Sequence, residues 1–193
     1  EDQARSMKTY TAFFNTEPQL GTVIVGMTAG LEEARANGTE DVDDETINDV
    51  LMQEVESKYF LSERIKPTLL ADGSSNFKSR SDINKKIARP LTATMHKMHR
   101  ACQDNYYSQD FIESHGKINP VDTMTKEELA KLPIRKLTPE EAFMLQGFPA
   151  EFAIKARANG VSDGALYKQA GNAVSVNTIY AVLYYLIMNK IIK

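Results

Sequence analysis

Several features are scarce in this 193-residue sequence, and their scarcity narrows its class. There is one cysteine, which excludes an internal disulfide and is typical of a reducing cytoplasm. There is no signal peptide, and the most apolar stretch, residues 179–188, is too short to span a bilayer. We therefore expect a cytoplasmic protein with no membrane segment, in which this stretch forms a buried helix. Because the chain begins with Glu1 in place of Met, we also expect a fragment.

Acidic residues are scarce in one part of the chain only. The formal net charge is −3, but residues 1–57 hold 13 acidic against 3 basic residues, whereas residues 58–100 hold 3 acidic against 10 basic. Basic side chains at this density are typical of a surface that binds a polyanion through the release of counterions. An ordinary solvated surface is the alternative. Residues 1–57 carry helical patterns and no catalytic cluster, so we expect a soluble helical segment there.

The run over residues 135–149 predicts a short helix with well-defined ends. Thr138 can cap its first turn, and Glu141 lies three residues later, as in a capping box. A proline at the first helical position and a glycine after the last turn complete the pattern. Thr125 and Glu128 form a second capping box before another short helix. These local signals predict helices and do not by themselves indicate a function.

The same run belongs to a longer pattern. Residues 135–149 read Arg-x-Leu-Thr-Pro-x-Glu, three residues, then Leu-Gln-Gly-Phe-Pro, and residues 167–174 read Tyr-x-Gln-x-Gly-Asn-Ala-Val. In order, spacing and identity, the two runs resemble the last two signature blocks of the DNA (cytosine-5)-methyltransferases. The resemblance covers roughly residues 58–193 and is to the C-terminal part of such an enzyme.

The resemblance implies an α+β fold, a fragment of a Rossmann-like methyltransferase. We expect an acidic helical segment over residues 1–57 and a DNA target-recognition region, small and irregular with short strands, over residues 58–134. A helical C-terminal part over residues 135–193 would hold both signature runs. Its last helix is apolar over most of its circumference, so we expect self-association or a partner to cover it.

In this family a variable target-recognition region precedes the first run and commonly carries a Thr-Leu or Leu-Thr pair near the flipped cytosine. Leu91-Thr92 resembles this pair, with Thr68-Leu69 as second choice, and the alternative is that Thr92 is an ordinary strand residue. Basic side chains on loops suit phosphate contacts with double-stranded DNA. The candidate DNA-binding residues are Lys78, Arg80, Lys85, Arg89, Thr92, Arg100 and Arg135.

The second run is expected to lie near the cofactor. Gly171 lets the backbone come close to a ligand, and Asn172 presents an amide side chain. In the family this block closes one side of the S-adenosyl-L-methionine pocket, so the resemblance implies that Gly171, Asn172, Ala173 and Val174 contact that cofactor. The alternative for Asn172 is a cap on the terminal helix.

No catalytic or metal-binding residue is assigned. Ala101-Cys102 differs from the Pro-Cys nucleophile of the family, and Cys102 follows the recognition region where the family's nucleophile precedes it, so we expect a packed, unreactive cysteine. His96, His99 and Cys102 are spaced i, i+3 and i+6, but a fourth ligand at suitable spacing is missing. We expect solvated or DNA-facing histidines.

The elements that transfer the methyl group in this family are not found in the sequence: a Gly-rich cofactor loop, the Pro-Cys nucleophile, a Glu that contacts the cytosine and an Arg-rich block. The chain alone should therefore be inactive. We expect it to bind DNA, help hold the flipped base and share the cofactor with a catalytic half on another chain. A non-catalytic DNA-binding module is the alternative.

Residues 12–50 resemble a second family. Phe13-Phe14-Asn15-Thr16-Glu17-Pro18 and Gly26-Met27-Thr28-Ala29 are similar to a piece of the mannose-family phosphotransferase component called IID. If both resemblances hold, the chain is a chimera. A sugar-transport function based on residues 12–50 alone predicts no affinity for DNA.

Overall fold

The computed structural model describes residues 47–73, 79–97 and 99–191, and the chain divides into two compact units. One unit is Thr46–Ala173, and the other combines Val174–Lys193 with Glu1–Glu45. Most of the predicted N-terminal helical segment, residues 1–46, lies outside the described residues. In its remainder the structure has a single 3-10 turn, η1 (Ile47–Asp49), before residue 57.

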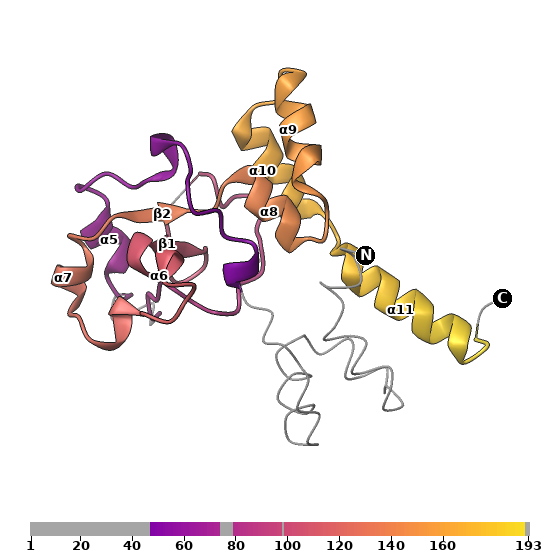
Figure 1. The fold of residues 1–193 in the computed structure, drawn as a ribbon, viewed down its shortest axis with the longest axis horizontal. Coiled ribbons are helices and arrows are strands. Elements are labelled where there is room, and N and C mark those ends of the chain that lie inside the picture. Colours follow the sequence, from indigo (N-terminus) through magenta and orange to yellow (C-terminus); the bar gives the residue numbers. More distant parts are fainter. Residues whose placement is uncertain (1–46, 74–78, 98, 192–193) are drawn as a thin grey trace. The chain divides into compact units, whose positions relative to one another are not determined.

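The larger unit is built from short helices around a two-stranded sheet, which confirms the predicted α+β class (Figure 1). After η1 its elements are, in order, η2 (Ser57–Tyr59), α5 (Lys66–Leu70), β1 (Tyr106–Ser108), α6 (Gln109–Glu113), η3 (Pro120–Asp122), α7 (Lys126–Leu129), β2 (Ile134–Lys136), α8 (Pro139–Leu145), α9 (Ala150–Ala158) and α10 (Asp163–Asn172). β1 lies within the expected recognition region, and β2 crosses into the expected C-terminal part.

The two strands join regions that are far apart in sequence. β1 and β2 are antiparallel, and Tyr107 pairs with Arg135 in their register. On its other side Arg135 forms an isolated bridge with Phe60. The expected boundary between residues 134 and 135 therefore falls inside β2, and the expected recognition region shares a sheet with the first signature run. The compact unit also crosses the boundary expected at residue 57, because Leu51 and Tyr107 belong to one hydrophobic cluster.

Helix α8 begins as the sequence predicts. The Thr138 hydroxyl accepts a hydrogen bond from the Glu141 amide at 3.2 Å, and the Glu141 carboxylate accepts one from the Thr138 amide at 2.6 Å. Thr125 and Glu128 form the same reciprocal pair at the start of α7. Gln146 and Gly147, the latter with a φ of 83°, then end α8. Both predicted capping boxes are confirmed.

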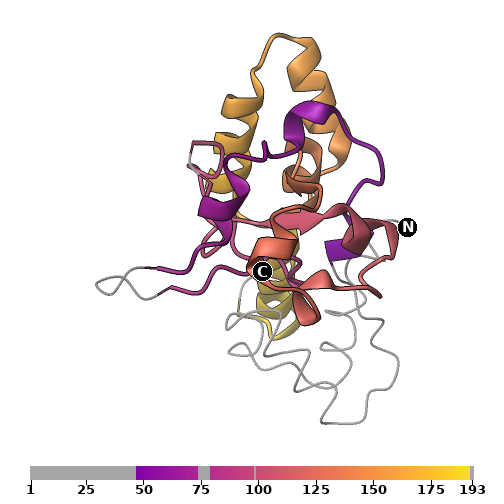
Figure 2. The ribbon, with the colours of Figure 1, turned by 90° about the vertical axis from the view of Figure 1, so that its left-hand side faces the viewer.

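Helices α9 and α10 form a hairpin that packs on α8 (Figure 2). Gly160 follows α9 with a φ of 85°, and the Ser162 hydroxyl caps α10. Arg157 of α9 donates hydrogen bonds to Glu140 of α8 and to Asp163 of α10, the latter at 2.9 Å. The hairpin is thus held to α8 and closed across its own turn. The shared core consists of Tyr59, Ala142, Phe143, Ala153, Leu166, Tyr167 and Ala170.

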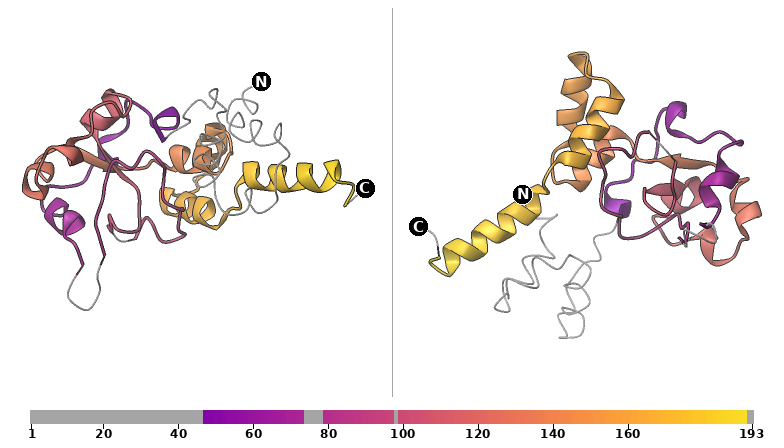
Figure 3. Two further views of the ribbon diagram at one scale, coloured as in Figure 1. Left: turned by 90° about the horizontal axis from the view of Figure 1, so that it is seen from below. Right: turned by 180° about the vertical axis from the view of Figure 1, so that it is seen from behind.

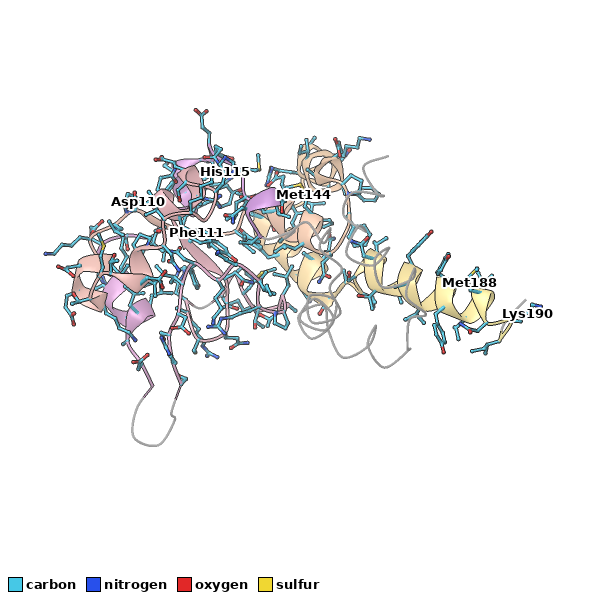
Figure 4. The ribbon with its side chains drawn as sticks, turned by 60° about the horizontal axis from the view of Figure 1, so that its bottom comes forward. Asp110, Phe111, His115, Met144, Met188 and Lys190 are labelled. Atoms are coloured by element: carbon cyan, nitrogen blue, oxygen red, sulfur yellow. The ribbon has the colours of Figure 1, made fainter. Side chains whose placement is uncertain are left out.

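The remaining core lies on the two sides of the sheet region. One cluster groups α5 and α7 with β2, through Leu69, Leu129 and Ile134 among others. Another groups η1 with α6, through Ile47 and Phe111, which is labelled in Figure 4. Figure 3 shows the segments that flank residues 74–78 leaving this region side by side, joined by the Gly73 to Ser79 hydrogen bond. Lys78 lies outside the described residues.

The smaller unit contributes one described helix, α11 (Val176–Met188). Six of its apolar side chains are exposed, with fractions from 37% at Tyr184 to 62% at Met188, which Figure 4 labels. The predicted helix forms, but the described residues leave these side chains uncovered, which differs from the buried helix expected over residues 179–188. By length and composition alone, Asp163–Met188 could span a membrane, although the extended backbone of Ala173 divides it.

Candidate functional site

A buried ion pair organises the first signature run. Arg135 donates from Nη1 and Nη2 to the two carboxylate oxygens of Glu141, at 2.9 and 2.7 Å, and both side chains are 0% exposed. The same carboxylate accepts hydrogen bonds from the amides of Thr138 and Met52, and Arg135 also donates to the Met52 carbonyl. Burying two charges is costly unless both are fully hydrogen-bonded, and this arrangement satisfies both carboxylate oxygens.

The structure gives Arg135 a structural role in place of the predicted DNA contact. Its guanidinium has no exposed surface on which a phosphate could bind. Instead it fixes the Met52 segment to the start of α8 through the shared Glu141 carboxylate. Sequence reasoning assigned Glu141 to the helix cap alone, and so it missed the partner that takes Arg135 out of solvent.

Two hydrogen bonds join the two signature runs. The Gln146 side chain, at the end of α8, donates from Nε2 to the Ala170 carbonyl in α10 at 2.9 Å. The buried Tyr167 hydroxyl donates to the Leu137 carbonyl at 2.6 Å, and burial raises the pKa of this phenol. The last turns of α10 are therefore held in one position relative to α8.

The segment of residues 80–92 is positioned by buried amide side chains. Asn84, which adopts a φ of 58°, accepts a hydrogen bond from the Ser108 amide at 2.7 Å. Asn105 accepts from the Arg89 amide at 2.8 Å and donates back to the Arg89 carbonyl at 3.0 Å. Sequence reasoning missed both asparagines. The signal was weak, because asparagine is also common in solvent-exposed turns.

Four of the predicted basic residues lie along this segment and its neighbour, residues 100–106. Arg80 has an 81% exposed side chain and donates to Asp82 at 2.9 Å, and Lys85 pairs with the same carboxylate at 3.5 Å. Arg100 is exposed and donates to Gln103. Arg89 is partly buried, and its guanidinium donates to the Ala101 carbonyl at 3.2 Å. The structure thus leaves Arg80, Lys85 and Arg100 accessible and engages Arg89 internally.

Thr92 lies beside a buried carboxylate and outside both described strands. Its hydroxyl donates a long hydrogen bond, 3.5 Å, to Asp104, which is 8% exposed. Burial raises the pKa of this carboxyl. Asp104 also lines a small pocket with Lys136, whose pKa is lowered by burial. The other lining residues are Met95, Asn105, Tyr106, Leu137 and Tyr167.

The two neighbouring histidines pack against aromatic rings. His96 stacks on Tyr167, with ring centroids 6.3 Å apart and planes 5° apart. His99 Nδ1 lies 3.3 Å from the Tyr106 hydroxyl. Burial lowers the pKa of both imidazoles. Packing of this kind differs from the solvated or DNA-facing position expected from sequence.

Among the described residues no group of three His, Cys, Asp or Glu side chains could hold a metal ion. Cys102 is a free cysteine of intermediate burial. The structure places it in a turn next to the buried Ala101.

The second signature run ends α10, and its residues face different surroundings. A Cβ added to Gly171 would lie 2.2 Å from the Thr92 carbonyl carbon and 2.4 Å from the Ala93 nitrogen. Asn172 is exposed and is the last residue of α10, while Ser175 precedes α11, so Asn172 is not the cap of the terminal helix. Ala173 is partly exposed, and Val174 is 63% exposed. The sequence predicts that Gly171 lets the backbone approach a ligand, whereas in the structure the group that lies against Gly171 is the Thr92 backbone.

Comparison with known proteins places these features in a family context. A sequence model described as C-5 cytosine-specific DNA methylase matches residues 18–188. A type II methyltransferase of Lactococcus lactis subsp. cremoris is 33% identical over 136 residues, which are 70% of this chain and 30% of that protein. The Dnmt2 methyltransferase of S. pombe has a similar structure, with a TM-score of 0.55 and 15% identity over 83% of this chain and 47% of that one. This likeness supports the predicted fold.

A second kind of relative matches a shorter stretch. The sorbose-specific IID component of the phosphotransferase system of Lacticaseibacillus casei is 52% identical over 48 residues, 25% of this chain and 17% of that protein. This agrees with the second resemblance, for which residues 12–46 lie outside the described part. The methylase match begins at residue 18 and not near residue 58, so it overlaps the stretch that resembles IID.

Proposed function

Because this chain belongs to the C-5 cytosine-specific DNA methylases, we propose that it is the C-terminal, DNA-recognising portion of a DNA (cytosine-5)-methyltransferase. Such an enzyme transfers a methyl group from S-adenosyl-L-methionine to C5 of cytosine in a specific DNA site. The chain spans 30% of the length of its Lactococcus relative, in keeping with a portion of the whole enzyme.

One observation carries this proposal. Gly171, in the run assigned to the cofactor side, lies against the backbone of Thr92, in the pair assigned to the flipped base. A chain that had lost its link to methyl transfer would have no need to keep the second signature run in contact with the Leu91-Thr92 pair. The contact supports a shared role of recognition and cofactor residues in one enzyme.

Phosphate contacts are assigned to the accessible basic side chains Arg80, Lys85 and Arg100. Their exposure lets them exchange present carboxylate or amide partners for phosphate oxygens, and pairs at the surface cost little to separate. Arg89 orders the segment from inside, and Arg135 is excluded by its burial. Lys78 keeps its predicted assignment. Thr92 is assigned to the surroundings of the flipped base.

The cofactor wall is assigned to Asn172, Ala173 and Val174. S-adenosyl-L-methionine supplies the methyl group in this family, and the accessible amide of Asn172 and the apolar Val174 suit a ligand with polar and apolar parts. Gly171 fits such a contact poorly, because Thr92 occupies the space beside its α-carbon. The chain would form one wall, and a catalytic half would supply the others.

The chain is therefore proposed to be inactive alone and to act in the cytoplasm with a catalytic half. That half would also cover the apolar surface of α11, or a second copy of the chain would do so. A non-catalytic DNA-binding module is the second candidate, supported by the intact basic segment.

DNA binding is the first test. The full chain should bind a fluorescently labelled random-sequence duplex at about 50 mM salt, and the affinity should fall steeply towards about 200 mM. A logarithmic plot of affinity against salt gives the number of phosphate contacts. Folded protein that shows no binding at the lower salt would contradict the proposal and favour the sugar-transport reading of residues 12–50.

Complementation separates the two candidates. The chain is mixed with the N-terminal, catalytic portion of the Lactococcus relative, radiolabelled S-adenosyl-L-methionine and DNA. Methyl transfer should require both proteins, and neither alone should label the DNA. Binding of DNA without rescue, at protein concentrations that saturate the duplex, would favour the non-catalytic module.

A further inference from the structure

Gly171 occupies a position at which helix geometry does not call for glycine. It lies in the last turn of α10, where an ordinary residue could adopt the same backbone, and glycine in a helix costs about 1 kcal/mol relative to alanine. The space around it supplies the reason. A Cβ there would lie 2.2 to 2.4 Å from the carbonyl carbon and oxygen of Thr92 and the nitrogen of Ala93.

Neither side of this contact can yield easily. The neighbouring Ala170 is 0% exposed, and its carbonyl accepts the Gln146 hydrogen bond. The atoms on the other side belong to a peptide group and cannot rotate away as a flexible side chain would. An added methyl group must therefore displace the backbone at residues 92–93.

Thr92 is also held from its other side. Its hydroxyl donates to Asp104, and its carbonyl accepts from the Met95 amide at 3.2 Å, closing a turn over residues 92–95. The turn is thus bounded by the buried Asp104 carboxylate and by the end of α10. Its position is set by how closely α10 approaches, and this closeness depends on the missing Cβ of Gly171.

We propose that Gly171 is a positioning residue for residues 91–95: by letting the Thr92 peptide rest on α10, it fixes the placement of this segment and hence DNA sequence selection. The effect on DNA sequence selection rests on the proposed function, whereas the positioning of residues 91–95 by Gly171 does not. Phosphate binding by Arg80, Lys85 and Arg100 does not depend on this contact, so sequence selection and non-specific affinity should separate.

The test compares Gly171→Ala with Gly164→Ala. Both glycines belong to α10, but a Cβ at Gly164 would meet only the His96 side chain, at an ordinary 3.5 Å. Hydrogen exchange of the full chain measures the placement. In Gly171→Ala the amides of residues 92–95 should exchange at least about tenfold faster, with the Gly164→Ala protein unchanged. Unchanged exchange and unchanged amide chemical shifts in Gly171→Ala would overturn the proposal.

Selection from a random-sequence DNA pool gives the second readout. Wild type and Gly164→Ala should enrich a common sequence, while Gly171→Ala should lose the enrichment and keep salt-dependent binding to bulk DNA. Equal enrichment by all three proteins would contradict the assigned role in selection. If the wild-type protein enriches no sequence, the proposed function in DNA recognition is contradicted. Hydrogen exchange then still tests whether Gly171 positions residues 91–95.

A third variant tests the positioning of residues 91–95 by α10 if Gly171→Ala does not fold. Gln146→Ala removes the hydrogen bond to the Ala170 carbonyl without adding an atom to the contact. Exchange should then rise both at the end of α10 and at residues 92–95. A rise confined to α10 would show that the segment is placed independently of the helix, against the proposal.

Discussion

Two arginines with the same predicted role have opposite surroundings in the structure. Arg80 has an 81% exposed side chain and bonds to Asp82 at the surface, whereas Arg135 is 0% exposed and pairs with both oxygens of Glu141. An exposed pair gains little net free energy, because water already solvates both charges. A buried pair has lost that water, so each partner depends on the other. The burial of the carboxylate partner therefore decides whether an arginine is free to contact DNA or is held in a structural pair.

The largest effect is expected at the buried end of this comparison. Arg135→Met leaves the Glu141 carboxylate buried without its counter-ion, and the free energy of unfolding should fall by about 3 to 5 kcal/mol. Urea denaturation followed by circular dichroism measures the change. Arg80→Met, the exposed counterpart, should shift it by less than about 0.5 kcal/mol.

A double variant sharpens the same point. In Arg135→Met combined with Glu141→Leu neither charge of this pair remains, and the combined loss should be smaller than the sum of the two single losses. Strict additivity would contradict a direct dependence between the two side chains. The stability still lost in the double variant would reflect the amides of Thr138 and Met52, because both donate hydrogen bonds to the Glu141 carboxylate that the variant removes.

The two capping boxes repeat the contrast between buried and exposed. Thr138 is 2% exposed, while Thr125 is exposed. Thr138→Ala should cost about 1 to 2 kcal/mol, and Thr125→Ala about 0.5 to 1 kcal/mol, because water can replace the exposed cap. Thermal unfolding of both variants tests the order. Equal losses would show that burial does not govern the strength of these caps.

Asp104 is a buried carboxylate that lacks the bidentate arginine of Glu141. Because burial raises its pKa in the folded state, its protonated form stabilises the fold below the unfolded pKa near 4, and this stabilisation is lost as pH rises through the folded pKa. Asp104→Asn removes the charge and can still accept from Thr92. Its melting temperature should exceed that of wild type at pH 7, and the gain should vanish below about pH 4. A gain that persists in acid would have another cause.

The smallest effect on stability is expected at the exposed end. Arg80→Gln with Lys85→Gln should leave the unfolding free energy within about 0.5 kcal/mol of wild type. If both contact phosphate, the slope of log affinity against log salt should fall by about 0.9 for each. Lys155→Gln, on the exposed surface of α9, is the control and should leave the slope unchanged.

The sequence was sufficient where the causes are local. The capping boxes at Thr138 and Thr125 each involve residues three apart, and both form as predicted. The α+β class also followed from the resemblance, because the two signature runs come with a known fold.

Roles that depend on distant partners could not be predicted in the same way. Arg135 can be buried because the Glu141 carboxylate that caps the helix also accepts its hydrogen bonds. The carbonyl of Met52, 83 residues away, accepts a further one. Gly171 was predicted to let its backbone approach a ligand, but in the fold the group beside it is the backbone of Thr92. Nor does the apolar pattern of α11, which predicts a need for cover, say which chain provides that cover.

The hairpin of α9 and α10 has a consequence for how this region tolerates changes in length. The end of α10 is tied to the end of α8 by the hydrogen bond from Gln146 to Ala170, while a Cβ added at Gly160, in the turn of the hairpin, would meet no atom within 4 Å. Residues inserted after Gly160 would therefore lengthen a protruding tip and leave Thr92 and α8 where they are. The turn at residue 160 is a suitable place for a peptide tag or a fluorescent label that should report on the chain without disturbing it.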